Sequence, residues 1–455
     1  MRIKEINIKG LFGLFNHRIP LNMEDHITII YGPNGIGKTV ILKLIKSIFE
    51  SDYNQLREIP YEVLSIEFDN QSRLNITSET EISRPNEEDF TPRTDLIFEL
   101  IRSNCETERH KITREKPDSR ARYILQHYPI SRIEREIPGI VRIGPNKWVE
   151  NRTGDKLSLE DIIYRYQGQI PFLDQFQDII VKKDPPWLVD IKDSIKIFLI
   201  ETERLYVNRE NSYEDKNKKM LSVLNYSKEI ASMIQANLAK YGEKSQSMDR
   251  TFPFRLIEIT GSSILPPEEL IKKLSELENK RVQLMDSALL DDEGSLDLRE
   301  LFKKIDESNK NVFSAYIKDV EDKLSFFDEL NEKINLFKRI INDRFRYKQM
   351  LIDKQDGFVF ITKAKDIISP SQLSSGEQHE LVMIFELLFK VPPNSLILID
   401  EPEISLHILW QQQFLKDLQE ITTLGKFDVL IATHSPEIIY DRDDLAVQLV
   451  ERVDV

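Results

Sequence analysis

The chain has 455 residues, of which 40% are hydrophobic and 31% are charged, which is typical of a folded globular protein and excludes a disordered one. It is longer than one compact domain usually is, so we expect two or three lobes. The net charge of −14 argues against a protein that coats nucleic acid non-specifically, because such proteins are usually basic.

The cellular compartment is indicated by what the sequence does not contain. A single cysteine, Cys105, excludes an internal disulfide and fits a reducing compartment. The N-terminal segment MRIKEINIKG has no apolar core of a secretory signal, and no apolar run is long enough to span a bilayer. The seven histidines have no spacing typical of a metal site. We therefore expect a cytoplasmic protein with no membrane segment.

Short strands are predicted at the start of the chain. Ile3, Ile6 and Ile8 lie close to one face of an extended segment, which suits a sheet. Residues 61–79 alternate around the turn sequence DNQS and predict a hairpin. These segments predict an antiparallel sheet.

Residues 27–49 predict a phosphate-binding loop. A β-branched strand at 27–31 precedes GPNGIGKT, and apolar residues at helical spacing follow, so the pattern G-x-x-x-x-G-K-[ST] stands between strand and helix as it must. Glycines let backbone N–H groups crowd around phosphate oxygens, Lys38 should reach the β- and γ-phosphates, and Thr39 should ligate Mg²⁺. The expected nucleotide contacts are Gly32, Asn34, Gly35, Gly37, Lys38 and Thr39.

Residues 101–152 are locally basic, with 12 Lys and Arg against 7 Asp and Glu. Such a stretch can bind nucleic acid or an acidic protein, and it can equally be a solvated surface, which is the interpretation we favour.

Residues 262–346 show helical periodicity in two stripes. The first stripe is short, and a turn around Gly294 separates it from the second. A short coiled coil used for interaction or oligomerisation and a plain helical subdomain both fit this pattern. The stripes consist of Leu270, Leu274 and Leu277, and then Val320, Leu324, Phe327, Leu330, Ile334, Phe337 and Ile341.

An apolar strand at 396–399 ends in two adjacent acids, Asp400 and Glu401. A buried strand rarely ends in two unpaired carboxylates without a cation nearby. In P-loop nucleotide hydrolases a second strand delivers an acid to the metal. We expect Asp400 to hold Mg²⁺ and Glu401 to be the general base that polarises the attacking water.

Three further segments carry a family resemblance: LSSGEQ at 373–378, EISLH at 403–407 and LIATHS at 430–435. They are similar to the signature motif, the D-loop and the switch-histidine strand of ABC ATPases. With the order of the motifs, the chain resembles an ABC-type ATPase of the SMC, OLD and RecF group. This resemblance implies an α/β fold, an ABC-type P-loop head with a RecA-like mixed sheet and an antiparallel β lobe, and an inserted helical hairpin or coiled coil.

The resemblance also implies residue roles. His434 stands at the γ-phosphate sensor, and a signature helix N-terminus would bind the γ-phosphate of ATP held by a second protomer. In the turn where the family usually has a Gln that contacts the metal, the candidate here is Glu203. The implied signature contacts are Ser374, Ser375, Gly376 and Glu377.

The implied domains are residues 1–210 and 351–455 for the two parts of the head and 211–350 for the helical insertion. OLD nucleases carry a Toprim domain after the switch histidine, and because this chain ends at Val455 we expect no nuclease in cis.

Stand-alone heads of this layout resemble the ATPase subunits of bacterial anti-phage systems, PARIS first and Septu next. That resemblance implies a homo-oligomeric scaffold that controls a separate effector, a Toprim or other nuclease, in response to a phage protein. A RecF-like repair ATPase that binds duplex DNA is the alternative. A transporter subunit is disfavoured by the long insertion.

Overall fold

The computed structural model describes residues 1–81, 93–102, 106–113, 137, 139–144, 147–150, 156–158, 162, 184–200, 206–207, 220–258, 265–291 and 309–450. The chain divides into two compact units. The first, here called the sheet unit, comprises Met1–Lys219 and Val391–Val455; the second, the helical unit, comprises Met220–Lys390. The second boundary therefore follows residue 390 and not residue 350, because residues 351–390 pack within the helical unit.

A five-stranded sheet forms the centre of the sheet unit, in the order β11-β17-β18-β3-β19. Every described pair in it is parallel. Strands β17 and β18 are almost entirely buried, as expected of parallel strands covered on both faces. The strands are β3 (Ile27–Tyr31), β11 (Lys196–Ile200), β17 (Ser395–Asp400), β18 (Asp428–Thr433) and β19 (Ala446–Gln448).

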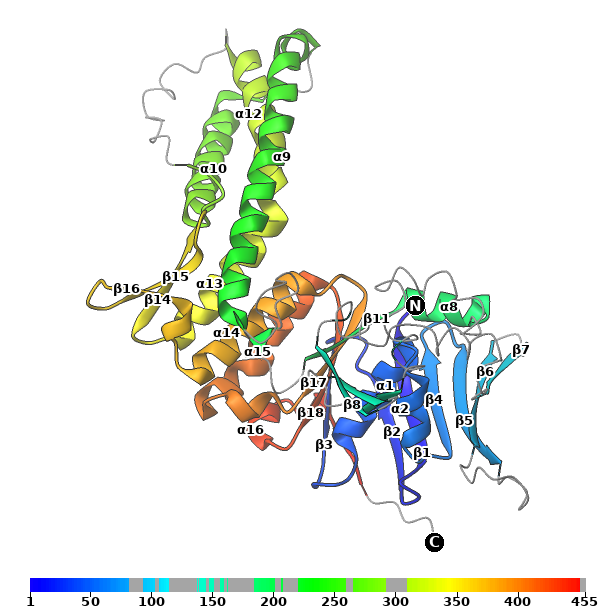
Figure 1. The fold of residues 1–455 in the computed structure, drawn as a ribbon. Coiled ribbons are helices and arrows are strands. Elements are labelled where there is room, and N and C mark those ends of the chain that lie inside the picture. Colours follow the sequence, from blue (N-terminus) through cyan, green and yellow to red (C-terminus); the bar gives the residue numbers. More distant parts are fainter. Residues whose placement is uncertain are drawn as a thin grey trace. The chain divides into compact units, whose positions relative to one another are not determined.

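Helix α1 (Lys38–Phe49) packs on this sheet against β11, β17 and β18 (Figure 1). Its fully buried Ile41, Leu44 and Ile45 share one core with residues of the parallel strands. This packing fixes the start of α1 at the carboxyl ends of the strands. The other helices and turns of the unit are α2 (Tyr53–Glu58), α8 (Pro186–Ser194), η6 (Pro402–Ser405), α15 (Ile408–Gly425), α16 (Pro436–Ile439) and η7 (Asp443–Leu445).

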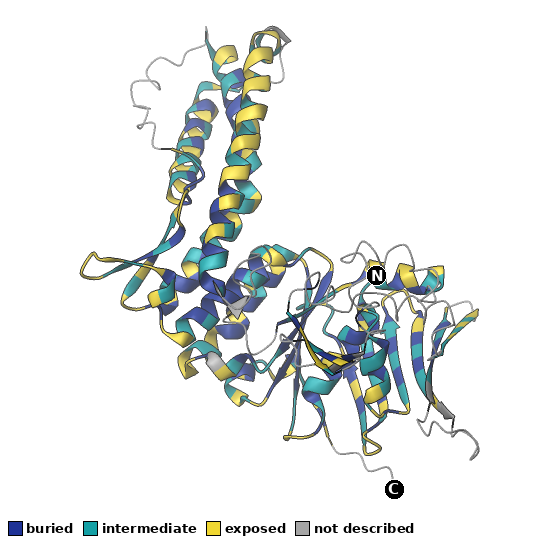
Figure 2. Ribbon diagram, in the orientation of Figure 1, coloured by how far each residue is buried: buried dark blue, intermediate teal, exposed yellow. Residues whose placement is uncertain are grey.

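A six-stranded sheet in the order β2-β1-β4-β5-β6-β7 is antiparallel throughout its described pairs. The predicted hairpin is confirmed, with Asp69–Ser72 as its turn. Buried and less buried residues alternate along its strands, as a sheet with one covered face requires (Figure 2). The strands are β1 (Ile3–Leu11), β2 (Phe15–Pro20), β4 (Val63–Phe68), β5 (Arg73–Glu81), β6 (Arg93–Ile101) and β7 (Thr107–Ile112). A smaller sheet joins β8 (Ile140–Gly144), β9 (Lys147–Glu150) and β10 (Lys156–Ser158), and β12 covers Tyr206–Val207.

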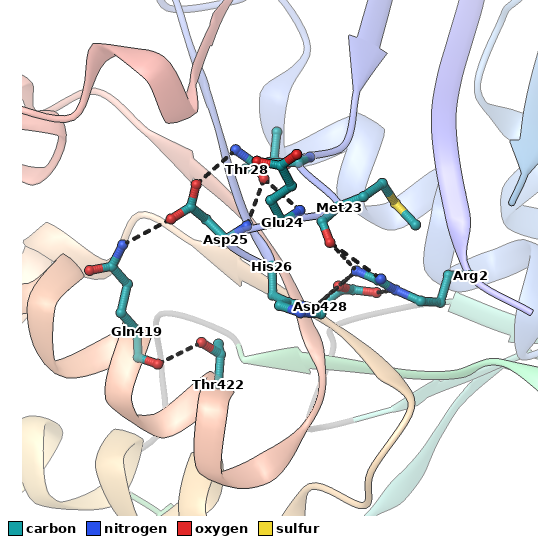
Figure 3. A network of polar contacts seen from close by, with 10 residues as sticks. Arg2, Met23, Glu24, Asp25, His26, Thr28, Gln419, Thr422 and Asp428 are labelled. Atoms are coloured by element: carbon teal, nitrogen blue, oxygen red, sulfur yellow. Dashed lines mark hydrogen bonds and ion pairs between the residues drawn. The ribbon is translucent and has the colours of Figure 1, made fainter.

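An ion pair ties the two larger sheets together at the amino ends of the parallel strands (Figure 3). Arg2, just before β1, donates from Nε to Asp428 Oδ2 at 2.8 Å, and Asp428 is the first residue of β18. His26 Nδ1 lies 2.9 Å from the other oxygen of Asp428. The hydrogen bond from Arg2 to Asp428 raises the pKa of Arg2, so the guanidinium stays charged.

The helical unit contains the inserted helices that the sequence predicts. The leucines of the first stripe are buried on α10, and the second stripe runs through α12, a 3₁₀ turn and α13. Helix α12 lies beside α9 and α10 (Figure 1). The helices are α9 (Ser222–Glu258), α10 (Pro267–Asp286), α12 (Lys310–Leu324), η3 (Ser325–Phe327), α13 (Asp328–Arg344), η4 (Pro370–Gln372), α14 (Ser375–Phe385) and the π-helix η5 (Glu386–Lys390). The strands are β13 (Met220–Leu221), β14 (Lys348–Asp353), β15 (Gly357–Thr362) and β16 (Ile367–Ile368).

A buried ion pair joins α13 to α14. Arg344 and Glu380 contact each other, and both side chains are 0% exposed. Removing one partner of such a pair leaves an uncompensated buried charge. We therefore expect Glu380→Ala to lower the free energy of unfolding by roughly 3–5 kcal/mol.

Denaturant unfolding of the full chain, followed by circular dichroism, measures this loss. The matched control is Glu329→Ala, which breaks an i,i+4 pair with Lys333 whose Glu side chain is 83% exposed. That change should cost less than about 1 kcal/mol. Equal losses in the two variants would contradict the prediction.

Candidate nucleotide-binding site

The loop of residues 32–37 joins β3 to α1 and depends on its glycines. Gly35 and Gly37 have left-handed φ values of +84° and +101°. A Cβ on Gly37 would lie 2.7 Å from Leu11 Cδ2, and one on Gly32 would lie 2.9 Å from the carbonyl oxygen of Leu449. Positive φ and close neighbours both disfavour a side chain here. The loop therefore presents backbone where a phosphate would approach.

Lys38 begins α1 and is nearly buried, with 5% exposure. Its ammonium donates to the carbonyl oxygens of Gly32 at 2.8 Å and Pro33 at 3.1 Å, and lies 3.2 Å from His434 Nδ1. Burial lowers the pKa of Lys38, and three neighbouring carboxylates oppose that shift: Glu401, Glu403 and Asp400. The loop thus holds a cation at its centre, where it fits an incoming phosphate.

Thr39 and Asp400 bring a hydroxyl and a carboxylate together. Thr39 Oγ1 donates to Asp400 Oδ1 at 3.1 Å, which joins α1 to the end of β17. Burial raises the pKa of Asp400, and the hydrogen bond from Thr39 opposes this rise.

This donor set fits Mg²⁺, which takes oxygen ligands and usually binds through one or two protein groups together with water and substrate phosphates. Within the described ranges no group of three or more His, Cys, Asp and Glu could hold a metal. Mg²⁺ bound by Thr39 and Asp400 would take its other ligands from phosphate and water, as it commonly does.

Glu401 stands in a sharp turn after β17. Its backbone is left-handed, with φ of +46°, and its N–H donates to the carbonyl oxygen of Ala432 at 2.8 Å. The carboxylate Oε1 lies 3.6 Å from His434 Nε2. About a third of each side chain is exposed, 30% for Glu401 and 33% for His434, so water reaches both.

Strand order explains why these residues meet. Strands β17, β18 and β3 are adjacent and parallel, so their carboxyl ends share one edge of the sheet. Glu401 follows β17, His434 follows β18 and the loop of residues 32–37 follows β3. Ligands of open parallel sheets bind at this edge. The structure thus brings together Lys38, Thr39, Asp400, Glu401 and His434, which the sequence places far apart.

The signature residues lie in the helical unit at the start of α14. Ser374 is the N-cap, and its N–H and hydroxyl donate to Glu377 Oε2 at 2.8 and 2.9 Å. Lys348 Nζ binds both oxygens of Glu377, at 2.8 and 2.6 Å. Burial tends to raise the pKa of Glu377, but these hydrogen bonds outweigh it and the pKa is lowered. Ser375 and Gly376 form the first turn of the helix.

The predicted metal contact and part of the basic segment 101–152 lie outside the described residues. Glu203, the candidate metal contact, is outside them, as are Arg114, Lys116, Arg120 and Arg122 of the basic segment. Three cations of that segment, which lie on or beside the six-stranded antiparallel sheet, are ion-paired. The pairs are Arg102 with Glu108, Arg109 with Glu99, and Lys111 with Asp95.

Two residues of the site were not identified from the sequence. Glu403 accepts hydrogen bonds from the N–H groups of His434 and Ser435, at 2.7 and 3.2 Å. Gln411 accepts one from the hydroxyl of Ser435 at 2.7 Å. The sequence places Glu403 in the D-loop-like segment 403–407, directly after the pair of acids and Pro402, but it gives no individual role to Glu403 or Gln411.

No helix among the described residues combines the length and the apolar character needed to cross a membrane.

Residues 1–439 match the AAA ATPase domain family. No curated protein matches the chain in sequence. Among solved structures, the chain is similar to the Smc head domain with an extended coiled coil bound to the C-terminal domain of ScpA from Pyrococcus furiosus, with 13% identity, coverage of 99% of this chain and 94% of that one, and a TM-score of 0.36. The chain is also similar to the SMC head domain from Thermotoga maritima, with 12% identity, coverage of 98% of this chain and 92% of that one, and a TM-score of 0.31.

The family match covers the first part of the sheet unit, the whole helical unit and the second part of the sheet unit as far as residue 439. A glycine-rich loop, an acid-terminated strand and a histidine meet at one edge of the parallel sheet. The chain belongs to the AAA ATPase domain family.

Proposed function

We propose that the chain binds ATP with Mg²⁺ at the carboxyl edge of the parallel sheet and hydrolyses it in a site shared by two copies. The observation that carries this proposal is the cluster of Lys38, Glu401 and His434, in which His434 lies 3.2 Å from the lysine and 3.6 Å from the carboxylate. A buried cation beside a water-accessible carboxylate is the arrangement that phosphate binding and water activation require.

Each residue has a separate task. The loop N–H groups and Lys38 bind and orient the phosphates, and the N-terminus of α1 adds its positive end. Glu401 accepts the proton of the attacking water. His434 donates toward the terminal phosphate. Thr39 and Asp400 hold the metal, which supplies charge neutralisation at the phosphate oxygens when it is bound.

The site is completed by the signature of a second copy. Ser374, Ser375 and Gly376 begin an 11-residue helix whose N-terminus is suited to an anion. Because Glu377 is neutralised by Lys348, the cap carries no net repulsion toward a phosphate. Hydrolysis by a single copy should therefore be slow, and ATP should join two copies head to head.

The proposed biological role is that of an oligomeric sensor and scaffold in bacterial anti-phage defence, which controls a separate effector, a Toprim or other nuclease. The acidic net charge of −14 supports a protein partner over nucleic acid. The ion pairing of Arg102, Arg109 and Lys111 supports it further, because these cations are already neutralised. The RecF-like alternative, which binds duplex DNA, is supported by the cations of the basic segment that lie outside the described residues.

Co-expression with the neighbouring gene tests this role. The protein is purified with that neighbour, and its mass in solution is measured with ATP and Mg²⁺ and without them. We expect a large assembly that contains both chains. An ATP-dependent dimer that retains no neighbour and binds duplex DNA with steep salt dependence would replace the proposal with the RecF-like one.

A further inference from the structure

We propose that Glu403 is a positioning residue for the switch histidine: its carboxylate holds the backbone of His434 and Ser435 and thereby sets where the imidazole stands. The inference rests on the proposed function and adds to it a residue with no assigned role. Glu403 touches neither Lys38 nor Glu401 through a hydrogen bond among the described contacts, so it would act through His434.

The carboxylate of Glu403 is hydrogen-bonded to the backbone of the segment that carries His434. Glu403 lies in η6, the 3₁₀ turn after β17, and one of its oxygens, Oε1, accepts from His434 N at 2.7 Å and Ser435 N at 3.2 Å. Two N–H donors on one carboxylate oxygen form charge-assisted hydrogen bonds, which are about twice as strong as neutral ones. The N–H of His434 thus gains a charged acceptor beyond the end of β18, and the N–H of Ser435 is shared between Glu403 and Thr433 Oγ1, which lies at 3.0 Å.

The second carboxylate oxygen strengthens this assignment. Glu403 Oε2 is buried and has no hydrogen-bond partner among the described residues. Burying one oxygen of an ionised carboxylate costs free energy unless hydrogen bonds or a nearby opposite charge stabilise the charge. Here compensation comes from the two backbone N–H groups and from the nearby charge of Lys38. The carboxylate is therefore restricted to one place and can hold the backbone firmly.

Helix α15 fixes both ends of this contact. Gln411 Oε1 accepts from the Ser435 hydroxyl at 2.7 Å, while its Nε2 donates to the carbonyl oxygen of Leu406 at 3.0 Å. The turn that carries Glu403 and the segment that carries His434 are thus held by one side chain as well as by each other. A shift of the turn would move the imidazole relative to Lys38 and Glu401.

Four variants of the full chain test the assignment: Glu403→Ala, Glu403→Gln, His434→Ala and the double variant Glu403→Ala with His434→Ala. We expect Glu403→Ala to lower kcat by about 10- to 100-fold with KM nearly unchanged, since a misplacement of 1 Å can cost that much. Glu403→Gln keeps an acceptor oxygen and should lose less. Once His434 is absent, Glu403→Ala should cost less than about twofold, because the two residues act as a unit.

Backbone amide exchange in the nucleotide-free protein gives a second readout that needs no turnover. The peptide covering residues 430–440 should exchange faster in Glu403→Ala than in the native chain, while a peptide from β3 should not change. The charge-matched control is Glu24→Gln, an exposed residue near the other end of the sheet (Figure 3). It should leave both exchange and kcat unchanged.

The positioning role of Glu403 and the proposed ATPase function would be overturned by different results. Unchanged exchange at 430–440 in Glu403→Ala, or a full loss of kcat that adds to that of His434→Ala, would overturn the positioning role. A native chain that hydrolyses ATP no faster than Lys38→Ala would overturn the proposed function, and the exchange result would remain interpretable by itself.

Discussion

Replacing Glu401 by Gln should reduce ATP turnover by at least about 100-fold while ATP affinity stays within about twofold, since removing a general base typically costs 10²–10⁴ in rate. The amide keeps the size and one acceptor oxygen of the carboxylate but cannot take a proton. Among the described residues no hydrogen bond joins Glu401 to the loop of residues 32–37, and the Glu401 backbone is held by Ala432, so the substitution should leave the turn intact.

Turnover is measured by phosphate release at saturating ATP, and affinity by equilibrium titration with a fluorescent nucleotide. The same variant should accumulate an ATP-joined pair of copies, which light scattering would detect. Glu437→Gln is the matched control, because that carboxylate accepts an exposed hydrogen bond from Gln412 Nε2 at 2.8 Å. Native turnover in Glu401→Gln would show that another group activates the water.

Removing the ammonium of Lys38 should have its largest effect on binding. A hydrogen bond to a charged group contributes about 1.5–3 kcal/mol, so Lys38→Ala should weaken ATP binding by roughly 10- to 150-fold. The mutant also leaves the carbonyl oxygens of Gly32 and Pro33 without their donor, which loosens the empty loop.

Calorimetric titration with ATP and Mg²⁺ measures this loss. Lys46→Ala is the control on the same helix, since that lysine lies in the last turn and forms only a 3.8 Å pair with Glu50. It should bind ATP as the native chain does. Equal affinity in Lys38→Ala and Lys46→Ala would mean that the nucleotide binds elsewhere.

Much of the sheet unit could be predicted because local patterns determine it. Gly35 and Gly37 adopt positive φ as a phosphate loop requires, and the apolar run before Asp400 forms a buried strand. The DNQS turn joins the two strands of the predicted hairpin. In each case neighbouring residues alone set the backbone conformation.

Other features depend on packing between distant segments, and local sequence patterns do not predict them. Helix α9 lies within the helical insertion expected for residues 211–350, but the two apolar stripes indicate helices only in residues 262–346, although Val223, Tyr226 and Ile230 lie at helical spacing and are buried. The polar stretch that follows, with its Pro253, hides the pattern. The role of Glu403 could not be found either, because its partners are backbone groups of residues 434 and 435. Every residue except proline has a backbone N–H, so the sequence does not show which of these groups a carboxylate will bind.

The boundary between the units shows the same limit. Residues 351–390 were assigned to the head because the signature belongs to it by resemblance. In the structure the strand β15 packs on α9 and the signature helix α14 contacts α9 and α13. Long-range contacts of this kind assign the segment to the helical unit.

The pairing of β11 with β17 has a consequence for folding during synthesis. Ile197 pairs with Leu396 and Leu199 with Leu398, so neighbouring strands of one sheet are separated by nearly two hundred residues of chain. During synthesis, β3 and β11 leave the ribosome long before β17 and β18 exist. Pairings of such high contact order form late and slowly. We expect the helical unit, which is inserted between β11 and β17, to fold before the parallel sheet is complete. Until β17 and β18 have been synthesised, β3 and β11 have unpaired edges that chaperones must protect from aggregation.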